Sequence, residues 1–319
     1  MKAIVQARFG SPDVLELTDR PRPAVARDAV LVHVRAASVN AYDWHVMRGT
    51  PYFARLSVGF RRPKSERVGG DAAGIVEEVG DDVVDLRAGD SVFGSRAGSF
   101  ADYVSGKTFI PMPSGLTFEQ AAAIPGAGCT ALQAVRDQGR VTAGQRVLIT
   151  GAGGGVGTFA VQIARSLGAH VTAVTSKPKI QLVESLGVEQ VLDRDGIERL
   201  RGGARFDVIL DVAGNRSLRT LARLLAPHGR LVMVAPAPGD WAAPILRVVL
   251  ANAWSRAESR TMSTFLARIT RDDLRVLAQL VDAGKLRPVI DSSYPLADAA
   301  AAVRRAESGA ACGKVVITI

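Results

Sequence analysis

Residues 146–176 constrain the fold more than any other part of this chain. They read RVLITGAGGGVGTFAVQIARSLGAHVTAVTS, so an apolar run meets five glycines within residues 151–157. Apolar side chains then recur at helical spacing up to Gly168, and a second apolar run begins at His170. This order predicts a strand, a tight turn, a helix and a second strand, which together make one βαβ unit.

The glycine turn, residues 151–157, has the physical properties of a pyrophosphate site. Glycine has no Cβ, so the backbone can approach a phosphate, and the N–H groups of the helix that starts near Gly155 point toward it. In the G-x-G-x-x-G pattern of dinucleotide-binding turns, the three key positions are Ala152, Gly154 and Gly157, with alanine in place of the first glycine. A tight connection that binds no ligand is the alternative, and the strand and helix around the turn disfavour it.

The end of the second strand indicates which dinucleotide binds. An NAD site has Asp or Glu about twenty residues after the glycines, to hold the ribose hydroxyl. Here residues 175–179 read TSKPK, and the next carboxylate is Glu184. The hydroxyl of Ser176 and the ammonium of Lys177 suit a 2′-phosphate, so the sequence predicts NADP(H). Ser176 can also cap the next helix, with the lysines in solvent, and both roles are compatible. The missing carboxylate argues against a methyltransferase.

The length and composition indicate a globular protein of two domains. The chain has 319 residues, of which 47% are hydrophobic, enough for two packed cores. No apolar run approaches a membrane span, and the first ten residues alternate like a strand and lack a secretory signal. We therefore expect a cytoplasmic protein that does not bind a membrane. Two cysteines, Cys129 and Cys312, cannot form a disulfide framework or a structural zinc site by themselves.

The charge does not predict a nucleic-acid partner. The formal net charge is +9, but basic and acidic residues are interspersed, as in residues 271–275, which is typical of solvated helix faces. The densest basic stretch is residues 55–67. A solvated loop is the interpretation that we favour there, and an anionic substrate or an acidic partner is the alternative.

The pattern of secondary structure changes along the chain. Residues 1–118 contain six short predicted strands between turns, which predict a small barrel, interrupted by a loop-rich segment at residues 40–67. Residues 119–285 alternate between helices and strands, which predicts a doubly wound parallel sheet. They include an apolar helix at residues 243–254 and a strand-like segment at residues 260–267. Residues 286–319 add a helix and a closing strand.

Short motifs along nearly the whole chain resemble those of the medium-chain dehydrogenase/reductase superfamily, in its zinc-free quinone oxidoreductase-like branch. They are NAYDW at 40–44, RG at 48–49, GDAAG at 70–74, GSFADY at 98–103, TA at 130–131, the glycine turn, DVAG at 211–214 and GKVV at 313–316. The resemblance implies a Rossmann nucleotide-binding domain at 119–285. It also implies a GroES-like catalytic domain built from residues 1–118 and the return segment 286–319, with the active-site cleft between the two domains.

The resemblance further implies hydride transfer from NADPH to a small quinone, enal or enone, and commonly a homodimer. Residues 260–267 are the candidate dimer edge, and an internal strand is the alternative. Cofactor contacts are expected from Thr130, Ala152, Gly154, Gly155, Val156, Gly157, Ser176, Lys177, Arg194, Gly214 and Lys314. Two of these carry reservations: Arg194 stands where many relatives have tyrosine, and a solvated residue at a strand end is the interpretation that we favour for Lys314.

Catalytic candidates lie in the motif that starts at Asn40. We expect Asn40 to position the nicotinamide or a substrate oxygen, although it can also be a turn residue. Asp43 is expected to orient the loop by accepting backbone N–H bonds. Tyr42, His45 and Tyr52 are the available proton donors, each of which can instead pack the cleft wall.

No metal site is expected. Zinc-dependent relatives have cysteine, histidine or glutamate where this chain has Asn40, Gly70, Asp71 and Gly126, and its four histidines are scattered. The leading hypothesis is therefore an NADPH-dependent, zinc-independent reductase. The alternative is an NADP(H)-binding regulatory or interaction protein with little turnover, which would use residues 55–67 or 243–254 as a contact surface.

Overall fold

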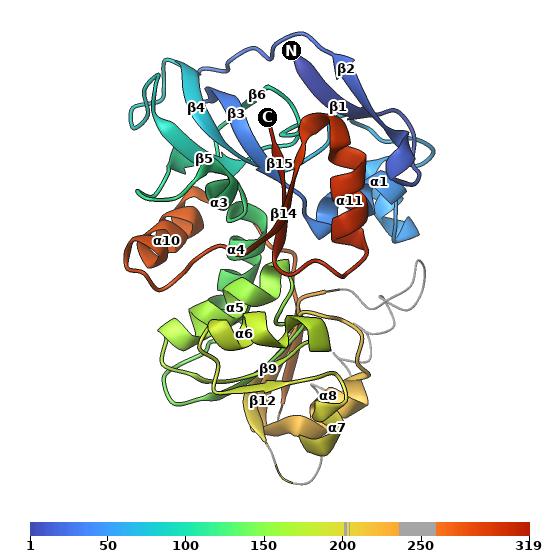
Figure 1. Ribbon diagram of the computed structural model, residues 1–319, viewed down its shortest axis with the longest axis vertical. Helices are drawn as coiled ribbons and strands as arrows, with labels where there is room; N and C mark the ends of the chain where they lie inside the picture. Colours follow the sequence, from blue (N-terminus) through green and yellow to red (C-terminus); the bar gives the residue numbers. More distant parts are fainter. Residues whose placement is uncertain (201–202, 204, 236–259) are drawn as a thin grey trace. The chain divides into compact units, whose positions relative to one another are not determined.

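The chain divides into two compact units. The computed structural model describes residues 1–200, 203, 205–235 and 260–319, so the predicted helix at residues 243–254 lies outside the described part. Unit 1 comprises Met1–Cys129 and Ile269–Ile319, and unit 2 comprises Thr130–Arg268. The first and last parts of the chain therefore belong to one unit (Figure 1).

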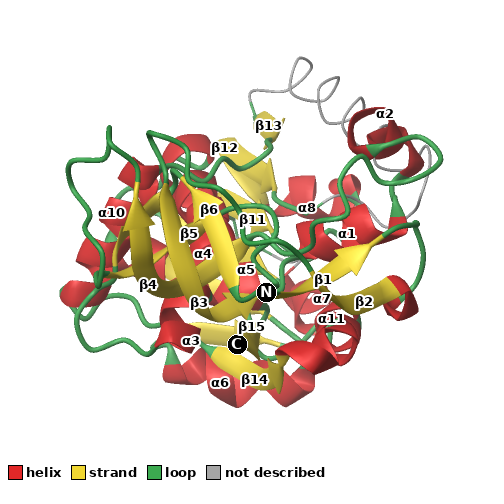
Figure 2. Ribbon diagram, turned by 90° about the horizontal axis from the view of Figure 1, so that it is seen from above, coloured by secondary structure: helices red, strands yellow, loops and turns green. Residues whose placement is uncertain are grey.

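Unit 1 is built on a mixed sheet whose order is β14-β15-β3-β4-β5-β7, with β6 paired to β3. Figure 2 shows β3, β4 and β5 as neighbouring strands. The strands are β3 (Val30–Ser38), β4 (Asp71–Val79), β5 (Ser91–Ser95), β6 (Tyr103–Gly106), β7 (Phe109–Pro111), β14 (Ile290–Pro295) and β15 (Lys314–Thr318). A separate antiparallel pair is formed by β1 (Lys2–Gln6) and β2 (Leu15–Asp19). Valines along β3 and β4 are fully buried and form the core of the sheet.

The closing strand joins the N-terminal strands, as the family resemblance implied. β15 pairs antiparallel with β3, with Val316 opposite Ser38. Helix α11 (Ala299–Glu307) covers this strand with Ala299, Ala302 and Val303, which lie on one face at helical spacing and are buried. This confirms a GroES-like domain built from both chain ends.

The predicted loop at residues 40–67 is wrong in its first part. Helix α1 (Ala41–Arg48) follows Asn40 directly, and the Asp43 carboxylate accepts the backbone N–H of Asn40 at 2.7 Å. This bond satisfies a donor that the helix itself leaves free. Tyrosine, tryptophan and histidine are weak helix formers, so the composition of the segment did not predict the helix. Two short elements follow, a 3₁₀ turn (Tyr52–Ala54) and α2 (Arg55–Val58).

Unit 2 contains the predicted parallel sheet, in the order β10-β9-β8-β11-β12-β13. Its strands are β8 (Arg146–Thr150), β9 (His170–Val174), β10 (Gln190–Leu192), β11 (Phe206–Asp211), β12 (Leu225–Met233) and β13 (Thr261–Thr264). Its helices include α5 (Gly155–Ser166), α6 (Ile180–Ser185), α7 (Gly196–Arg199) and α8 (Leu218–Leu224). Every pairing in this sheet is parallel. Together with unit 1, it confirms the α/β fold class with a doubly wound sheet and a barrel-like partner domain.

The compact units divide the chain after Cys129 and after Arg268, and the predicted domain bounds at residues 118 and 285 stay a prediction. Helix α3 (Phe118–Ala122) contacts β3 and β4, and α10 (Arg271–Asp282) contacts β7. Both helices therefore pack with unit 1. The remaining elements are α4 (Pro125–Leu132), a π-helical stretch (Gln133–Gln138) and short 3₁₀ turns at Pro12–Val14, Lys177–Lys179 and Leu296–Asp298.

Candidate active site

The glycine turn of unit 2 leaves open space where a phosphate would approach. Gly151 has a φ of +68°, and a Cβ on Gly157 would lie 2.1 Å from the Gly151 carbonyl oxygen. A Cβ on Gly154, by contrast, would meet only that same oxygen, at 3.4 Å. Glycine is therefore required at Gly151 and Gly157 by the turn itself, whereas Gly154 keeps the backbone accessible.

Helix α5 begins at this turn without a side-chain cap. Gly154 is the N-cap residue and has no side chain to form a hydrogen bond, and the first turn has no acidic residue. The uncapped N–H groups and the helix dipole together favour an anion at this end. The residues present thus fit a dinucleotide pyrophosphate at the predicted contacts Gly154, Gly155, Val156 and Gly157, with Ala152 buried under the turn.

The ends of β8 and β11 are fastened together beside the glycine turn. The Thr150 hydroxyl donates to Asp211 Oδ1 at 2.7 Å, and the Gly214 backbone N–H donates to the same oxygen at 3.2 Å. A Cβ on Gly151 would lie 3.0 Å from the Ala213 backbone nitrogen. The predicted nicotinamide contact Gly214 is therefore held at the same sheet edge as the glycine turn. Thr130, the other predicted contact, is half-buried in α4.

A buried lysine near the turn was not among the predicted contacts. Lys179 is 8% exposed, and a Cβ on Gly153 would lie 2.8 Å from the Lys179 Cβ. The same Cβ would lie 2.7 Å from the Thr175 hydroxyl. Lys177 is exposed, so the two lysines of the TSKPK segment differ in environment. Because both residues are lysines, the sequence alone did not indicate which of the two is buried.

The remaining contacts predicted at the nucleotide are less closely associated with the turn. Ser176 lies at the N-cap position of the following 3₁₀ turn, but its side chain makes no capping hydrogen bond there. Arg194 is exposed, and its carbonyl oxygen accepts a hydrogen bond from Arg216. Their roles toward a 2′-phosphate stay predictions.

Unit 1 contains a second polar centre, which we call the buried cluster: Asn40, Asp43, Asp71 and Lys314. The Lys314 ammonium donates to Asn40 Oδ1 at 2.6 Å and to the Val39 carbonyl oxygen at 2.8 Å. The Asn40 Nδ2 group donates to Asp71 Oδ2 at 2.8 Å. Lys314 is only 3% exposed, so the alternative of a solvated strand-end lysine is wrong.

The ionisable groups of the cluster are perturbed by their removal from water. The pKa of Asp43 is raised to about 7, mainly by burial and in part by the neighbouring Asp71 carboxylate, while the Asn40 N–H and the Lys314 ammonium oppose the shift. Burial also raises the pKa of Asp71 and lowers the pKa of Lys314, with the opposite charges of the cluster resisting both shifts. Two carboxyl groups and one ammonium thus share a site from which water is largely excluded.

Asp71 is held through one of its two oxygens. Oδ2 accepts from the Gly126 backbone N–H at 2.8 Å as well as from Asn40. Oδ1 is buried and has no hydrogen-bond partner among the described residues, which disfavours the ionised form. A Cβ on Gly126 would lie 2.9 Å from both Asp71 Oδ2 and Asn40 Oδ1. Three positions that hold zinc ligands in zinc-dependent relatives are therefore adjacent here.

These residues do not fit a zinc ion. Gly126 has no side chain, the Asn40 oxygen already accepts from Lys314, and a buried ammonium repels a second cation. In the described part of the chain, no group of three or more His, Cys, Asp or Glu side chains is placed to hold a metal. The cluster can supply hydrogen bonds from the Asn40 amide and from Lys314.

The predicted proton donors lie outside these hydrogen bonds. Tyr42 is 65% exposed. His45 Nδ1 lies 3.1 Å from the Thr50 carbonyl oxygen, and the Arg55 guanidinium stacks on the Tyr52 ring at 4.7 Å. Of the residues in that motif, only Asn40 and Asp43 join the buried cluster. Among the described helices, none has both the length and the apolar character to cross a membrane.

Two family profiles match the chain. The alcohol dehydrogenase GroES-like domain matches residues 26–134, and a family described as zinc-binding dehydrogenase matches residues 186–317. The description of the second family names zinc, but the described residues of the buried cluster do not fit a zinc ion.

Relatives match over the whole length. The mitochondrial NAD(P)H oxidoreductase RTN4IP1 of Mus musculus is 32% identical over 359 residues, covering 100% of this chain and 89% of that protein. The structure of a quinone oxidoreductase from Coxiella burnetii has a TM-score of 0.86 at 30% identity, covering 100% of this chain and 99% of that one. The Escherichia coli quinone oxidoreductase complexed with NADPH has a TM-score of 0.85 at 25% identity, covering 100% of both chains. The chain belongs to the medium-chain dehydrogenase/reductase superfamily, in its quinone oxidoreductase-like branch.

Proposed function

We propose that this protein is an NADPH-dependent reductase that passes hydride, without zinc, to a quinone, an enal, an enone or a similarly activated carbonyl compound. Its family membership makes it an oxidoreductase with NADP(H) as cofactor. The observation that carries the proposal is the glycine turn, where Gly154 stays accessible and α5 begins without a side-chain cap.

The chain's own residues provide binding and charge stabilisation. Bound NADPH supplies the hydride. The N–H groups at the start of α5 hold the pyrophosphate, and Ser176, Lys177 and the buried Lys179 offer a hydroxyl and ammonium groups to the 2′-phosphate. The second N–H of the Asn40 amide donates to an oxygen of the substrate or of the nicotinamide carboxamide, which stabilises charge that develops there. A quinone or enone is already polarised, so this needs no Lewis acid.

Cofactor titration tests the first half of the proposal. NADPH and NADH are titrated against the purified protein by fluorescence, and we expect NADPH to bind more tightly. The Lys179→Met variant should lose about tenfold in NADPH affinity, because a charged hydrogen bond to the phosphate is lost, and little in NADH affinity. Lys285→Met, at an exposed lysine, is the matched control. A preference of the wild type for NADH would contradict the assignment.

Turnover tests the second half. NADPH absorbance is followed with a panel of quinones and enals, and we expect consumption that depends on the acceptor. Tight NADPH binding without turnover on any acceptor would instead support the second candidate, a regulatory or interaction protein. One surface favours that candidate: Phe53, Leu56 and Phe60 are 46%, 79% and 72% exposed, within or beside the basic stretch at residues 55–67.

We further propose a homodimer and a cytoplasmic location. The dimer is supported by the position of β13 at the end of the described strand order. The location rests on the sequence alone, and the RTN4IP1 relatives bear the word mitochondrial in their names.

A further inference from the structure

Lys314 is connected to Asp71 by hydrogen bonds through the neutral side chain of Asn40. Its ammonium lies on the oxygen side of the Asn40 amide, at 2.6 Å, and the Asp71 carboxylate lies on the nitrogen side, at 2.8 Å. The cluster is therefore a chain of hydrogen bonds that runs from a cation through an amide to an acid. Both charged ends are almost fully buried, at 3% and 0% exposure.

This arrangement fixes the orientation of the Asn40 amide. A rotation of half a turn would place the NH₂ group against the ammonium and the carbonyl oxygen against the carboxylate. Both contacts would be repulsive, and burial makes them costly. The orientation of Asn40 is thus determined by the charges on either side of it and not by its own preference.

The NH₂ group has two N–H bonds, and Asp71 takes one of them. Asn40 as a whole is half-buried. We propose that Lys314 is a positioning residue: its ammonium serves as a built-in cation that holds the Asn40 amide with its second N–H directed to an oxygen of the substrate or cofactor. The identity of the oxygen that is bound rests on the proposed reductase function. The orientation of the Asn40 amide rests on the geometry alone.

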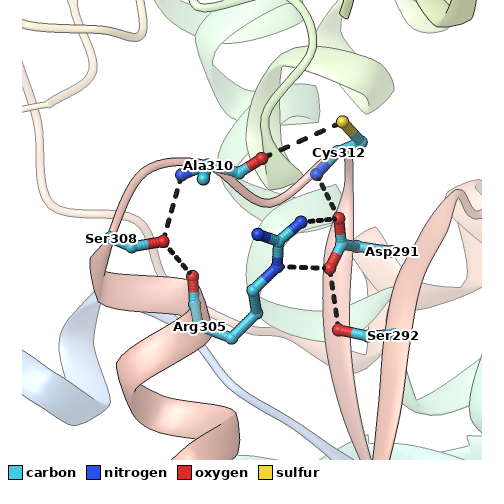
Figure 3. A network of polar contacts seen from close by, with 6 residues as sticks. All are labelled: Asp291, Ser292, Arg305, Ser308, Ala310 and Cys312. Carbon is cyan, nitrogen blue, oxygen red and sulfur yellow. Dashed lines mark hydrogen bonds and ion pairs between the residues drawn. The ribbon is translucent and has the colours of Figure 1, made fainter. Parts of the chain in front are cut away.

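Elements of unit 1 place Lys314 in the buried cluster. Gly313 has a φ of +94°, a Cβ there would lie 2.4 Å from the Val289 carbonyl oxygen, and the Lys314 backbone N–H donates to that oxygen at 2.8 Å. Figure 3 shows the loop before it, held by Asp291: the carboxylate accepts hydrogen bonds from Nε and Nη2 of Arg305 and from the Cys312 backbone N–H, the last at 2.7 Å. The start of β15 is therefore fixed before the lysine side chain enters the cluster.

Nuclear magnetic resonance tests the orientation without any assay of activity. The chain has only three asparagines, Asn40, Asn215 and Asn252, so ¹⁵N labelling of asparagine gives three side-chain NH₂ pairs. In the wild type, the Asn40 pair should be shifted away from the values of a solvated amide. In Lys314→Met it should move toward those values, and in Lys285→Met it should not move. An unchanged Asn40 pair in folded Lys314→Met would overturn the proposal.

Kinetics separates positioning from a merely structural role. Lys314→Met leaves the buried acids without their cation, so it should lose both stability and turnover, with kcat lower by about tenfold. The double variant Asp71→Asn with Lys314→Met removes the ammonium and one of the two carboxyl groups, leaving Asp43, and should regain part of the lost thermal stability, yet its kcat should stay low because no charge orients the amide. Recovery of kcat together with stability would overturn the proposal.

The two proposals can fail separately. If the wild type reduces none of the acceptors, the proposed function fails, and the ¹⁵N comparison still decides whether Lys314 orients Asn40. If the wild type reduces quinones and the Asn40 resonances are the same in the wild type and in Lys314→Met, the proposed function stands and the positioning role of Lys314 is excluded.

Discussion

Asp43 makes the stability of the protein depend on pH near neutrality. Its pKa is raised from 3.8 to about 7 by burial, so the folded state binds a proton that the unfolded state has lost between these values. The free energy of unfolding should therefore fall as the pH rises from about 4 to about 7. Asp43→Asn keeps an oxygen for the Asn40 N–H and removes the titration. Urea denaturation between pH 5 and 8 should show a shallower decline in the free energy of unfolding for this variant than for the wild type. Asp71, whose pKa is also raised, should account for the decline that remains. Equal slopes would refute the assignment.

Gly126 is constrained by the side chains of the buried cluster and not by its backbone angles. Gly126→Ala would place a methyl group 2.9 Å from Asp71 Oδ2 and from Asn40 Oδ1, which displaces two hydrogen-bonded groups. We expect a loss of about 1–3 kcal/mol in the free energy of unfolding. Gly128→Ala in the same helix is the control, since its Cβ would meet the flexible end of Leu277 at 3.0 Å. Equal losses in the two variants would show that packing against the cluster is not the cause.

At the scale of elements, Asp291 joins β14 to α11 and to the start of β15. Its side chain is 6% exposed, and the Arg305 guanidinium pairs with both carboxylate oxygens. The Arg305 hydrogen bonds lower the pKa of Asp291 to about 2. The stabilisation is therefore present above the ordinary pKa of 3.8 and is lost as the pH falls toward 2.

The Asp291→Asn variant tests this contribution. We expect it to be clearly less stable than the wild type at pH 7, because the variant side chain cannot accept from both Nε and Nη2 of Arg305, and the difference in stability should narrow between pH 4 and pH 2. Asp272→Asn is the control, since that carboxylate is 90% exposed in its pair with Arg275. A difference that persists undiminished at pH 2 would exclude the ion pair as its source.

The elements that the sequence predicted best are those with strong periodicity. The strand, glycine turn and helix of β8 and α5 were predicted because apolar spacing and glycine chemistry are local properties. β14 was not predicted, because its residues IDSSYP are mostly polar and its pairing partner β15 lies further along the chain. The burial of Lys314 could not be predicted either. It depends on the contact with Asn40, which is distant in sequence and becomes a neighbour only when β15 pairs with β3.

At the scale of the whole molecule, the proposed homodimer predicts that one edge of the unit 2 sheet meets a second copy. Its described strand order ends in β10 on one side and β13 on the other, and an open edge can pair with another chain. β13 was the predicted edge. Thr264 on β13 and Gln190 on β10 are both exposed, so they offer a matched pair of sites on opposite edges.

A lysine on an edge strand opposes pairing between copies because two like charges would meet there. We expect Thr264→Lys to shift the protein from dimer to monomer by size-exclusion chromatography with light scattering, while Gln190→Lys stays dimeric. Both variants should bind NADPH like the wild type, since neither residue touches the glycine turn. A dimer that is lost with Gln190→Lys instead would assign the interface to β10, and a dimer unaffected by either lysine would place it outside both edges. The interface is assigned to β13 only if the dimer is lost with Thr264→Lys and kept with Gln190→Lys. In that case the added charge acts at the β13 edge and not through a general effect on the fold.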